Sequence, residues 1–573
     1  MKIGLVHAPN KDFTENQNYG LLFAPVWAYV LSTYISKNQN FESQLYDLNM
    51  IEKGDITSCD YYFYSGINQD LESLLGVQSY LSSKYPASIS FLGGPIAWSF
   101  EKASELEKLN SFDHICIGDG ELLVPKIMNA LEGGQELPKI ILTEERFELA
   151  QSLPMDANLI NKTAKYYYGG VIEVSRGCPF LCEFCDIRVL PDNNRNHCRN
   201  IDSIIQELDT YRKNGITNIQ LACDNFIGDL DWAKHLVKRI LEFNKAHNWN
   251  PSFYTWLTIN IGNYDDLMKD MRLAGFDNLF IGVESFDNNS LLETSKLQNT
   301  KFTLVSTIRN IQSFGFIVVA GLIFGFDSDS EKSFDSTLDG ITDSGLLSGD
   351  ASLLTALPGT PLYRRMRLSD RLREFKHDSL LGGHKYVTNI KYLMSTDTII
   401  DGYITFSKKF MDGDYQYRRL INFYKIIKIS DNFMNVNRGG YTDPLVFLKK
   451  ASTNPTLLFF HLRRMIPIIF SARVYYLFKA LLFVIKNKFT HKIGIQYFIF
   501  WLFIWVNAIS KYGKITANDF DLDSVPNNYD IRKILPDNYR EEADEKIPAN
   551  KINAQFKATS TQLKKIIDIK LMA

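Results

Sequence analysis

The sequence predicts two successive α/β units followed by a mainly α-helical region, and three observations support this fold class. Between residues 3 and 131, short apolar runs alternate with helix-length stretches, which is typical of a doubly wound parallel sheet. Between residues 171 and 354 the alternation restarts with six apolar runs, which predicts a partial (β/α)6 barrel of parallel strands. After Tyr363 the pattern becomes helical, basic and apolar.

Length and composition agree with a division into several domains. The chain has 573 residues, of which 45% are hydrophobic, and this is enough for about three domains with separate cores. We expect a Rossmann-like domain over 1–150, a partial TIM barrel over 165–365 and a helical domain over 366–515. Residues 516–573 are expected to form a polar, partly disordered tail.

The net charge and the cysteines limit which cellular compartments and which classes of partner are expected. The net charge of -2 gives no overall basic field, so nucleic acid is not expected as the main partner. Seven cysteines without a regular framework argue against a secreted disulfide scaffold and for a reducing compartment. The first residues read as a strand rather than a signal peptide, so we expect a cytoplasmic chain.

In the first unit, polar and small residues follow the apolar runs at the places where doubly wound sheets bind ligands. The expected strands are 3–7, 43–46, 61–64, 88–92 and 115–117, and the expected helices are 22–36, 71–83, 100–108 and 121–131. The residues that follow the strands are Ser65, Gly93, Gly94, Pro95, Asp119, Gly120 and Glu121. Tight turns without a ligand explain the same glycines equally well.

In the second unit, the residues directly after each strand are expected to carry the chemistry, because parallel barrels gather their sites at the carboxyl ends. The expected strands are 171–174, 219–222, 253–259, 278–283, 317–323 and 351–354, and the expected helices are 201–213, 232–243, 264–273, 302–314 and 333–344. Polar residues at strand ends are Asp224, Asn225, Thr258, Asn260 and Glu284.

Three cysteines follow the first barrel strand at the spacing C-x3-C-x2-C. Cys178, Cys182 and Cys185 place three soft thiolates in one short loop. This set suits an iron-sulfur cubane, because three cysteines leave one of four irons open to another ligand. Structural zinc is the alternative, and His197 or Cys198 would then supply the fourth ligand.

The cysteine loop, with Phe184 before its last cysteine, resembles the signature of the radical SAM enzymes. The resemblance implies a [4Fe-4S] cluster on the three cysteines, whose open iron binds S-adenosylmethionine (SAM) and whose reduced form cleaves it to a 5'-deoxyadenosyl radical. It further implies SAM contacts from the five polar strand-end residues and an adenine contact from Phe184. The alternatives are a helix cap for the Asp224-Asn225 pair and a core position for Phe184.

The turns of the first unit resemble those of the cobalamin-binding domain found ahead of many radical SAM domains. This resemblance implies cobalamin contacts from the seven residues named after the first-unit strands. One departure is clear: the D-x-H-x-x-G loop that carries the cobalt-ligating histidine is missing. His7 and His114 lie in apolar strands and are expected to be core residues.

Together these features resemble the hopanoid methylase group of radical SAM methyltransferases. The resemblance implies that methylcobalamin methylates an unactivated carbon of a small, lipid-like substrate, with a flavodoxin or ferredoxin as reductant. Two alternatives stay open: a cobalamin-dependent rearrangement or cyclisation, and a non-catalytic iron-sulfur redox or corrinoid-carrier protein. A methylthiotransferase would need a second cysteine trio, and the first unit has only Cys59 and Cys116.

The stretch from 493 to 510 contains 18 residues without a charge. A membrane span needs about 20 residues, so three interpretations compete: a buried helix, an interfacial helix and a span. In the interfacial interpretation Trp501 and Trp505 face the bilayer, and 456–510 makes a peripheral membrane contact.

Overall fold

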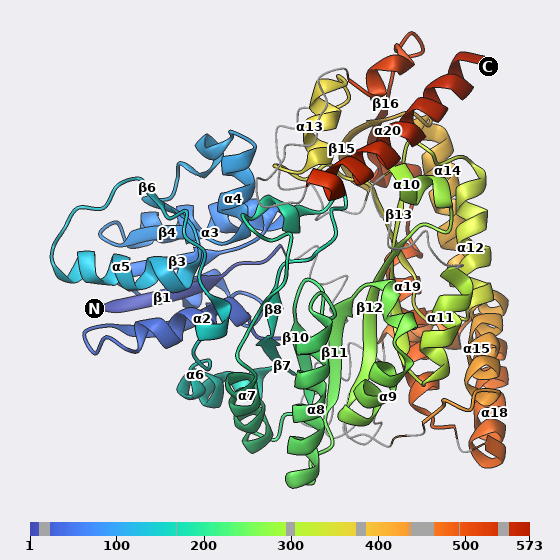
Figure 1. The fold of residues 1–573 in the computed structure, drawn as a ribbon, viewed down its shortest axis with the longest axis horizontal. Helices are drawn as coiled ribbons and strands as arrows, with labels where there is room; N and C mark the ends of the chain where they lie inside the picture. The colour runs from blue at the N-terminus through green and yellow to red at the C-terminus, as the bar shows by residue number, and fades with distance from the viewer. Residues whose placement is uncertain are drawn as a thin grey trace.

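A computed structural model of the chain shows an N-terminal sheet domain, a central barrel and a helical C-terminal region on the far side of the barrel (Figure 1). The residues that the structure describes are 1–10, 23–167, 169–293, 304–373, 386–434, 436, 463–491, 493–536 and 549–572.

The first sheet has six parallel strands in the order β2-β1-β3-β4-β5-β6, which confirms the doubly wound fold. Its strands are β1 (Lys2–His7), β2 (Glu42–Asp47), β3 (Tyr61–Ser65), β4 (Ile89–Gly93), β5 (His114–Ile117) and β6 (Ile140–Leu142). Its helices are α2 (Val26–Ile35), α3 (Leu71–Lys84), α4 (Pro95–Lys102) and α5 (Gly120–Glu132). Both faces of the sheet are covered by apolar cores. In β3, Phe63 packs into the core on one face, and Tyr62 and Tyr64 pack into the core on the other.

Helix α4 begins five residues earlier than the predicted 100–108. Pro95 occupies the first turn, where its fixed φ suits a helix and its missing N–H costs nothing. Gly94 precedes it with φ 87°, a conformation that glycine adopts readily. Strand β6 was not predicted, because three residues at an exposed edge give little apolar pattern.

The second sheet also has six parallel strands, in the order β14-β13-β12-β11-β10-β7. Since β7 and β14 lie at the two ends of this order, the barrel is open, as predicted. The strands are β7 (Gly170–Glu173), β10 (Asn218–Ala222), β11 (Ser252–Leu257), β12 (Phe276–Glu284), β13 (Ile317–Phe324) and β14 (Asp350–Leu353). The helices are α7 (Ile201–Lys213), α8 (Leu230–Ala246), α9 (Asp265–Ala274), α10 (Asn288–Glu293), α11 (Leu304–Ser313) and α12 (Lys332–Ser344).

The C-terminal region is mainly helical. Its helices are α13 (Pro361–Leu368), α14 (Thr396–Met411), α15 (Gly413–Lys428), α18 (Arg473–His491), α19 (Gln496–Tyr512) and α20 (Ala549–Met572). The tail is more regular than the predicted polar, partly disordered segment: β16 (Asp521–Ser524) pairs with β15 (Val387–Tyr392), and Leu563 of α20 packs against Ile534. The tail is ordered by contacts with residues distant in sequence, namely the partner strand β15 and a small apolar cluster. The local composition of the tail does not reveal these contacts.

Helix α19 covers most of the uncharged stretch 493–510 and is buried. Trp501 and Trp505 are fully enclosed, and their ring N–H groups donate to the carbonyl oxygens of Gln416 and Met411 at 2.9 and 3.0 Å. The buried-helix interpretation is therefore confirmed, and the assignment of these two tryptophans to a bilayer is wrong. The reason is that α14 and α15 supply apolar partners for a helix that is apolar on nearly all sides.

Within the described ranges, no single helix is both long and apolar enough to cross a membrane. The short helix Arg463–Ile469 and α18 together are long and apolar enough for a span, but the two helices meet at an angle of 97°. The predicted contact segment 456–510 also includes 456–462 and 492, which lie outside the described residues.

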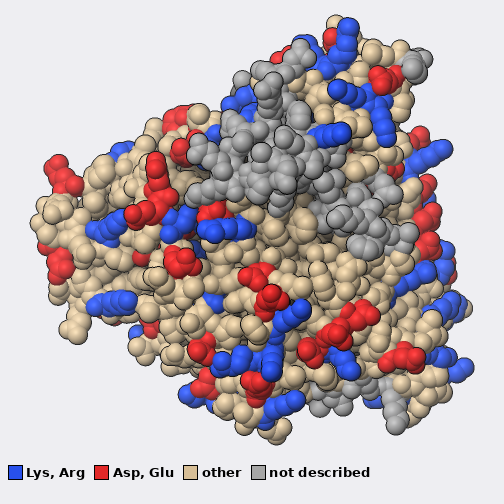
Figure 2. Space-filling model, in the orientation of Figure 1, with Lys and Arg blue, Asp and Glu red and all other residues tan. Residues whose placement is uncertain are grey.

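Lysine, arginine, aspartate and glutamate side chains are interspersed over the face drawn in Figure 2. This mixture agrees with a net charge of -2 and shows no broad single-sign field on that face.

Replacing Trp505 by alanine tests the buried position of α19. The change leaves a cavity among α14, α15 and α19, and we expect unfolding to become easier by about 3–5 kcal/mol. Thermal unfolding followed by tryptophan fluorescence and circular dichroism measures the loss. Trp256→Ala is the control, because Trp256 is 36% exposed and its removal is expected to cost less. Equal losses in the two variants would contradict the placement of α19.

Candidate active site

The cysteine loop leaves β7 at the open end of the barrel. Gly177 has φ 91°, and a Cβ there would collide with the carbonyl oxygen of Arg195. The backbone N–H of Cys178 donates to the carbonyl of Asn193 at 2.8 Å, and that of Cys185 donates to the carbonyl of Cys182 at 3.2 Å. The loop therefore folds on itself and against residues 193–195, in a conformation that requires glycine before the first cysteine.

The three thiols lie in a poorly solvated environment. Cys182 is buried, whereas Cys178 and Cys185 are partly buried. Burial raises the pKa of Cys178 to about 11 and raises the pKa of Cys185 as well. Thiolates at these positions need positive charge beside them, and the irons of a cluster provide it. Three cysteines on one short, water-poor loop thus fit a cluster with one open iron.

The zinc alternative receives no support from the surrounding residues. His197 and Cys198 form β9, which pairs with β8 (Ser175–Arg176), and the Nε2–H of His197 donates to the Asp192 carbonyl at 2.8 Å. Among the residues described, no three His, Cys, Asp or Glu side chains are grouped as ligands of a single metal ion.

Asp224 and Asn225, at the end of β10, both contact the cysteine loop. The Gly177 N–H donates to Asp224 Oδ2 at 2.6 Å, and Asn225 Nδ2 lies 3.8 Å from Cys178 Sγ. Burial raises the pKa of Asp224 to about 6 despite the bond from Gly177. The helix-cap interpretation of this pair is wrong, because α8 begins at Leu230 and its cap is Asp229.

The next two strand ends add polar groups beside Asn225. The Thr258 hydroxyl bonds to the side-chain oxygen of Asn260 and lies 3.5 Å from that of Asn225. Glu284 ends β12 in a buried position with φ 65°, where the register against β13 shifts. A non-glycine residue in this conformation costs of order 1–3 kcal/mol and is enriched at functional sites. The SAM contacts of these residues stay predictions.

Phe184 lies between the loop and the barrel. Its ring centroid is 6.5 Å from that of Phe326, and the side chain is partly buried against the main core. This position supports the core interpretation, and the adenine contact of Phe184 stays a prediction.

Arg176 joins the cysteine loop to the N-terminal sheet. Its guanidinium lies 2.5 Å from Glu121 of α5 and 2.8 Å from Glu173 of β7, with Asp119 at 3.6 Å. Asp119 also accepts from Arg146 Nε at 2.8 Å and from the Phe147 N–H. Both carboxylates predicted to contact cobalamin are thus paired within the chain.

The other residues predicted to contact cobalamin lie at the carboxyl edge of the first sheet. A Cβ on Gly94 would collide with Ser65 Oγ, so the ends of β3 and β4 approach each other closely. Gly93 ends β4, Pro95 opens α4 and Gly120 opens α5. Their cobalamin contacts stay predictions. His7 is half-buried, with its Nδ1 3.4 Å from Trp27 Nε1, and His114 stacks on Phe91.

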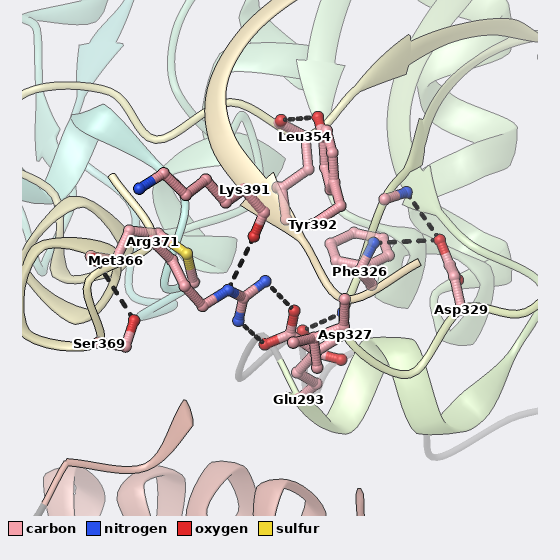
Figure 3. A network of polar contacts seen from close by, with 12 residues as sticks. Glu293, Phe326, Asp327, Asp329, Leu354, Met366, Ser369, Arg371, Lys391 and Tyr392 are labelled. Carbon is pink, nitrogen blue, oxygen red and sulfur yellow. Dashed lines mark hydrogen bonds and ion pairs between the residues drawn. The ribbon is translucent and has the colours of Figure 1, made fainter. Parts of the chain in front are cut away.

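A buried ion network holds the other end of the cysteine loop. Arg365 of α13 bonds both carboxylate oxygens of Glu183, at 2.7 and 3.0 Å, and reaches Asp327 at 2.9 Å. Arg371 binds both oxygens of Asp327, at 2.7 and 2.6 Å (Figure 3). All four side chains are almost fully excluded from solvent.

The pKa values of Asp327 and Glu293 in this network are shifted in opposite directions. Burial alone would raise the pKa of Asp327, but Arg371 and Arg365 hold it well below its usual range. Glu293, which accepts the N–H groups of Asp327 and Ser328, has its pKa raised to about 8 by burial and by the Asp327 charge (Figure 3). The network therefore places two guanidinium groups beside the Asp327 carboxylate, whose charged form they favour, and a Glu293 carboxyl whose charged form burial disfavours.

The loop after β14 joins the barrel to the first domain. Gly359 has φ 81°, and a Cβ there would lie 3.1 Å from Lys102 Cβ and from Val189. The Tyr363 hydroxyl donates to Glu105 at 2.6 Å, and Arg367 reaches the same carboxylate at 2.8 Å. The loop after β14 and the start of α13 therefore form an interdomain contact.

Comparison with known families assigns the barrel. The model of the radical SAM superfamily matches residues 172–341, from β7 to α12. The chain contains a radical SAM domain. That superfamily uses a [4Fe-4S] cluster and SAM, and the matched region includes the three-cysteine loop. Ligation of the cluster by Cys178, Cys182 and Cys185 stays a prediction.

Two relatives that match about half of the chain are named as a methyltransferase and a methylase. The chain is 28% identical over 337 residues to the "Uncharacterized methyltransferase sll1242" of Synechocystis sp., and 29% identical over 294 residues to the hopanoid C-2 methylase of Rhodopseudomonas palustris. These matches cover 58% and 51% of this chain, and 61% and 54% of the relatives. The chain thus matches little more than half the length of either relative.

A solved structure has the same arrangement of domains. OxsB, a cobalamin-dependent SAM radical enzyme solved with aqua-cobalamin and SAM, matches with a TM-score of 0.56 at 15% identity. The match covers 97% of this chain and 84% of OxsB. At this identity the likeness establishes the fold alone.

Sequence reasoning missed the arginines that hold the cluster loop. Arg176 stands between Ser175 and Gly177 in the motif itself, and Arg365 lies in a segment with other basic residues. A charged residue in the motif of a buried loop is a signal that could have identified Arg176. No comparable signal singles out Arg365 from Arg364 and Arg367.

Gly177→Ala tests the conformation of the cluster loop. A methyl group at this position forces the loop away from Arg195, so we expect less iron and sulfide in protein purified anaerobically. Gly215→Ala is the matched control, because Gly215 has φ 70° but no atom within 4 Å of the added Cβ. Full iron content in Gly177→Ala, equal to that of Gly215→Ala, would contradict the need for glycine before the first cysteine.

Arg365→Met tests the buried network. The change leaves the Glu183 carboxylate without its bidentate partner, and we expect a loss of about 3–5 kcal/mol of stability, with less cluster incorporated. Thermal unfolding and iron analysis measure the two effects. Arg367→Met is the control on the same helix, since that side chain is half exposed and its ion pair is worth about 1 kcal/mol or less. A stable, fully loaded Arg365→Met protein would refute the anchoring role.

Proposed function

We propose that this protein methylates an unactivated carbon of a small, lipid-like substrate, using a [4Fe-4S] cluster, SAM and cobalamin. The observation that carries the proposal is the three-cysteine loop at the mouth of a radical SAM domain, tied by Arg176 to the carboxyl edge of a doubly wound sheet. Such an edge is where these sheets bind cofactors.

The chain's own residues would hold the two cofactors in the barrel and exclude water. Bound cluster and SAM supply the radical chemistry of the superfamily, and bound cobalamin supplies a transferable methyl group. Cys178, Cys182 and Cys185 hold the cluster, and Asp224 and Asn225 lie against the same loop. Thr258, Asn260 and Glu284 offer acceptors to a ribose and an amino group. Cys182, Asn225 and Glu284 are buried and the other five side chains are partly buried, which limits the access of water to this region.

Cobalamin binding is supported by the shape of the first domain and by the likeness to OxsB. Gly93 ends β4 and Gly94 follows it at the carboxyl edge of the sheet, and this edge is where doubly wound sheets bind ligands. His7 is half-buried beside Trp27, which gives it a packing role. The two carboxylates Asp119 and Glu121 would shape the site through Arg146 and Arg176 instead of contacting the ring directly.

The substrate class rests on the similarity to the hopanoid C-2 methylase, which points to a lipid. A flavodoxin or ferredoxin is the proposed source of the electron. The alternatives are a rearrangement or cyclisation without methyl transfer, and a non-catalytic redox or corrinoid protein.

Anaerobic incubation with SAM labelled on its methyl carbon separates these functions. We expect reduced, cluster-loaded protein to release 5'-deoxyadenosine and to transfer label to cobalamin and then to a lipid extract. Cys178→Ala should lose both products because the cluster loses a ligand, whereas Cys198→Ala, outside the trio, should keep them. Cleavage with no labelled product would favour rearrangement, and absence of cleavage with an intact cluster would refute the enzymatic proposal.

A further inference from the structure

Helix α18 carries a row of large apolar side chains on its solvent face. The exposed fractions are 81% for Phe489, 68% for Leu482, 61% for Tyr475, 60% for Phe478 and 39% for Ile485. Their spacing of three, four, three and four residues places all five on one stripe of the helix. We call this row the α18 stripe. Single exposed apolar residues are common on proteins, whereas an aligned row of five is not.

The opposite face of α18 is attached to the protein. Ala480, Val484 and Asn487 are buried, and the ring of Phe483 lies 5.5 Å from that of Tyr424 in α15. Lys479 Nζ lies 4.6 Å from the centre of the Tyr417 ring. The helix therefore lies flat along the outer side of α15, at the edge of the molecule away from the first sheet (Figure 1).

The segment before α18 extends the apolar surface. The short helix Arg463–Ile469 meets α18 at 97°, and Ile466, Ile469 and Phe470 near the bend are exposed. Phe470 is 82% exposed, so the bend adds large exposed apolar side chains to the same continuous segment of chain.

This segment is basic without any acidic residue. Six lysines and arginines lie between 463 and 491, and no Asp or Glu occurs between Asp443 and Asp519. The chain as a whole has a net charge of -2, so the positive charge is a local property. Lys479 and Lys486 each follow a stripe residue, Tyr475 or Leu482, by four positions and therefore border the stripe.

We propose that the α18 stripe docks this protein on the surface of an anionic lipid bilayer, with α18 parallel to the membrane plane. An apolar face bordered by lysines, with no acidic side chain, is complementary to acyl chains below anionic headgroups. The helix does not cross the bilayer, because its other face is packed on α15 and no single helix in the described ranges is long and apolar enough.

A second copy of the chain is a poorer occupant of this surface. A symmetric dimer through the α18 stripe would bring two acid-free basic segments together, and like charges across an interface oppose association. An acidic protein partner would match the positive charge of this segment. The row of exposed aromatic and aliphatic side chains is better suited to the acyl chains of a bilayer, which adapt to any shape. Membrane docking is independent of the proposed methyl transfer, so either can fail without the other.

Vesicle co-sedimentation of the full-length protein tests the proposal. The probes are phosphatidylcholine vesicles with and without phosphatidylglycerol, at low and high salt. We expect binding to the anionic vesicles, weakened by salt. A triple variant of the α18 stripe, Phe478→Ser with Leu482→Ser and Phe489→Ser, should bind about a hundredfold less, because three apolar side chains no longer enter the bilayer. Lys486→Gln with Lys488→Gln should lower binding to anionic vesicles about tenfold and leave neutral vesicles unaffected.

Two further measurements make the result decisive. Leu142→Ser with Tyr166→Ser removes exposed apolar residues on other elements, so this control should bind like the parent protein. Circular dichroism should show that all variants keep their helix content. Unchanged binding of the stripe variant, or no binding by the parent protein, would overturn the proposal. The surface would instead belong to a second copy if light scattering showed that the parent protein is a dimer, the stripe variant a monomer, and neither bound vesicles.

Discussion

The pairing of Arg365 with Glu183 and Asp327 is the interaction on which the geometry of the site depends. Glu183 stands between the second and third cysteines, and its carboxylate is fully buried. A buried carboxylate is costly unless its charge is matched, so the loop can take this path only when α13 delivers Arg365 to it. Arg371 completes the network by balancing Asp327 at the end of β13. At the other end of the loop, Arg176 binds Glu121 and Glu173 in the same manner.

These two arginines connect three parts of the chain at the cysteine loop. Arg176 leads to α5 of the first domain, and Arg365 leads to α13, beyond the barrel. Tyr363 and Arg367 meet Glu105 of the first domain from the same helix α13. The first domain and the barrel region are therefore joined by ion pairs and hydrogen bonds on both sides of the cysteine loop.

The apolar periodicity of the sequence predicted much of the fold, since each barrel strand lies within about two residues of its predicted bounds. The cysteine spacing predicted the cluster loop for a comparable reason, because spacing is a local property. The partner of a charged residue is not local: Arg365 and Glu183 are 182 positions apart, and one sequence offers many possible pairs. The orientation of α19 was ambiguous for another reason. A helix that is apolar on all sides suits a core and a membrane alike, and only the tryptophan hydrogen bonds to α14 and α15 decide between them.

The wide sequence separation of the loop's partners has a consequence for the order of assembly. Residues 175–185 can reach their final path only after β13 and α13 have been synthesised and have docked, because Asp327 and Arg365 complete the network. Contacts between distant residues form late in folding, since the intervening chain must first be ordered. We therefore expect most of the barrel to fold before the three thiols are in position, so that a cluster held by them would be inserted late in maturation.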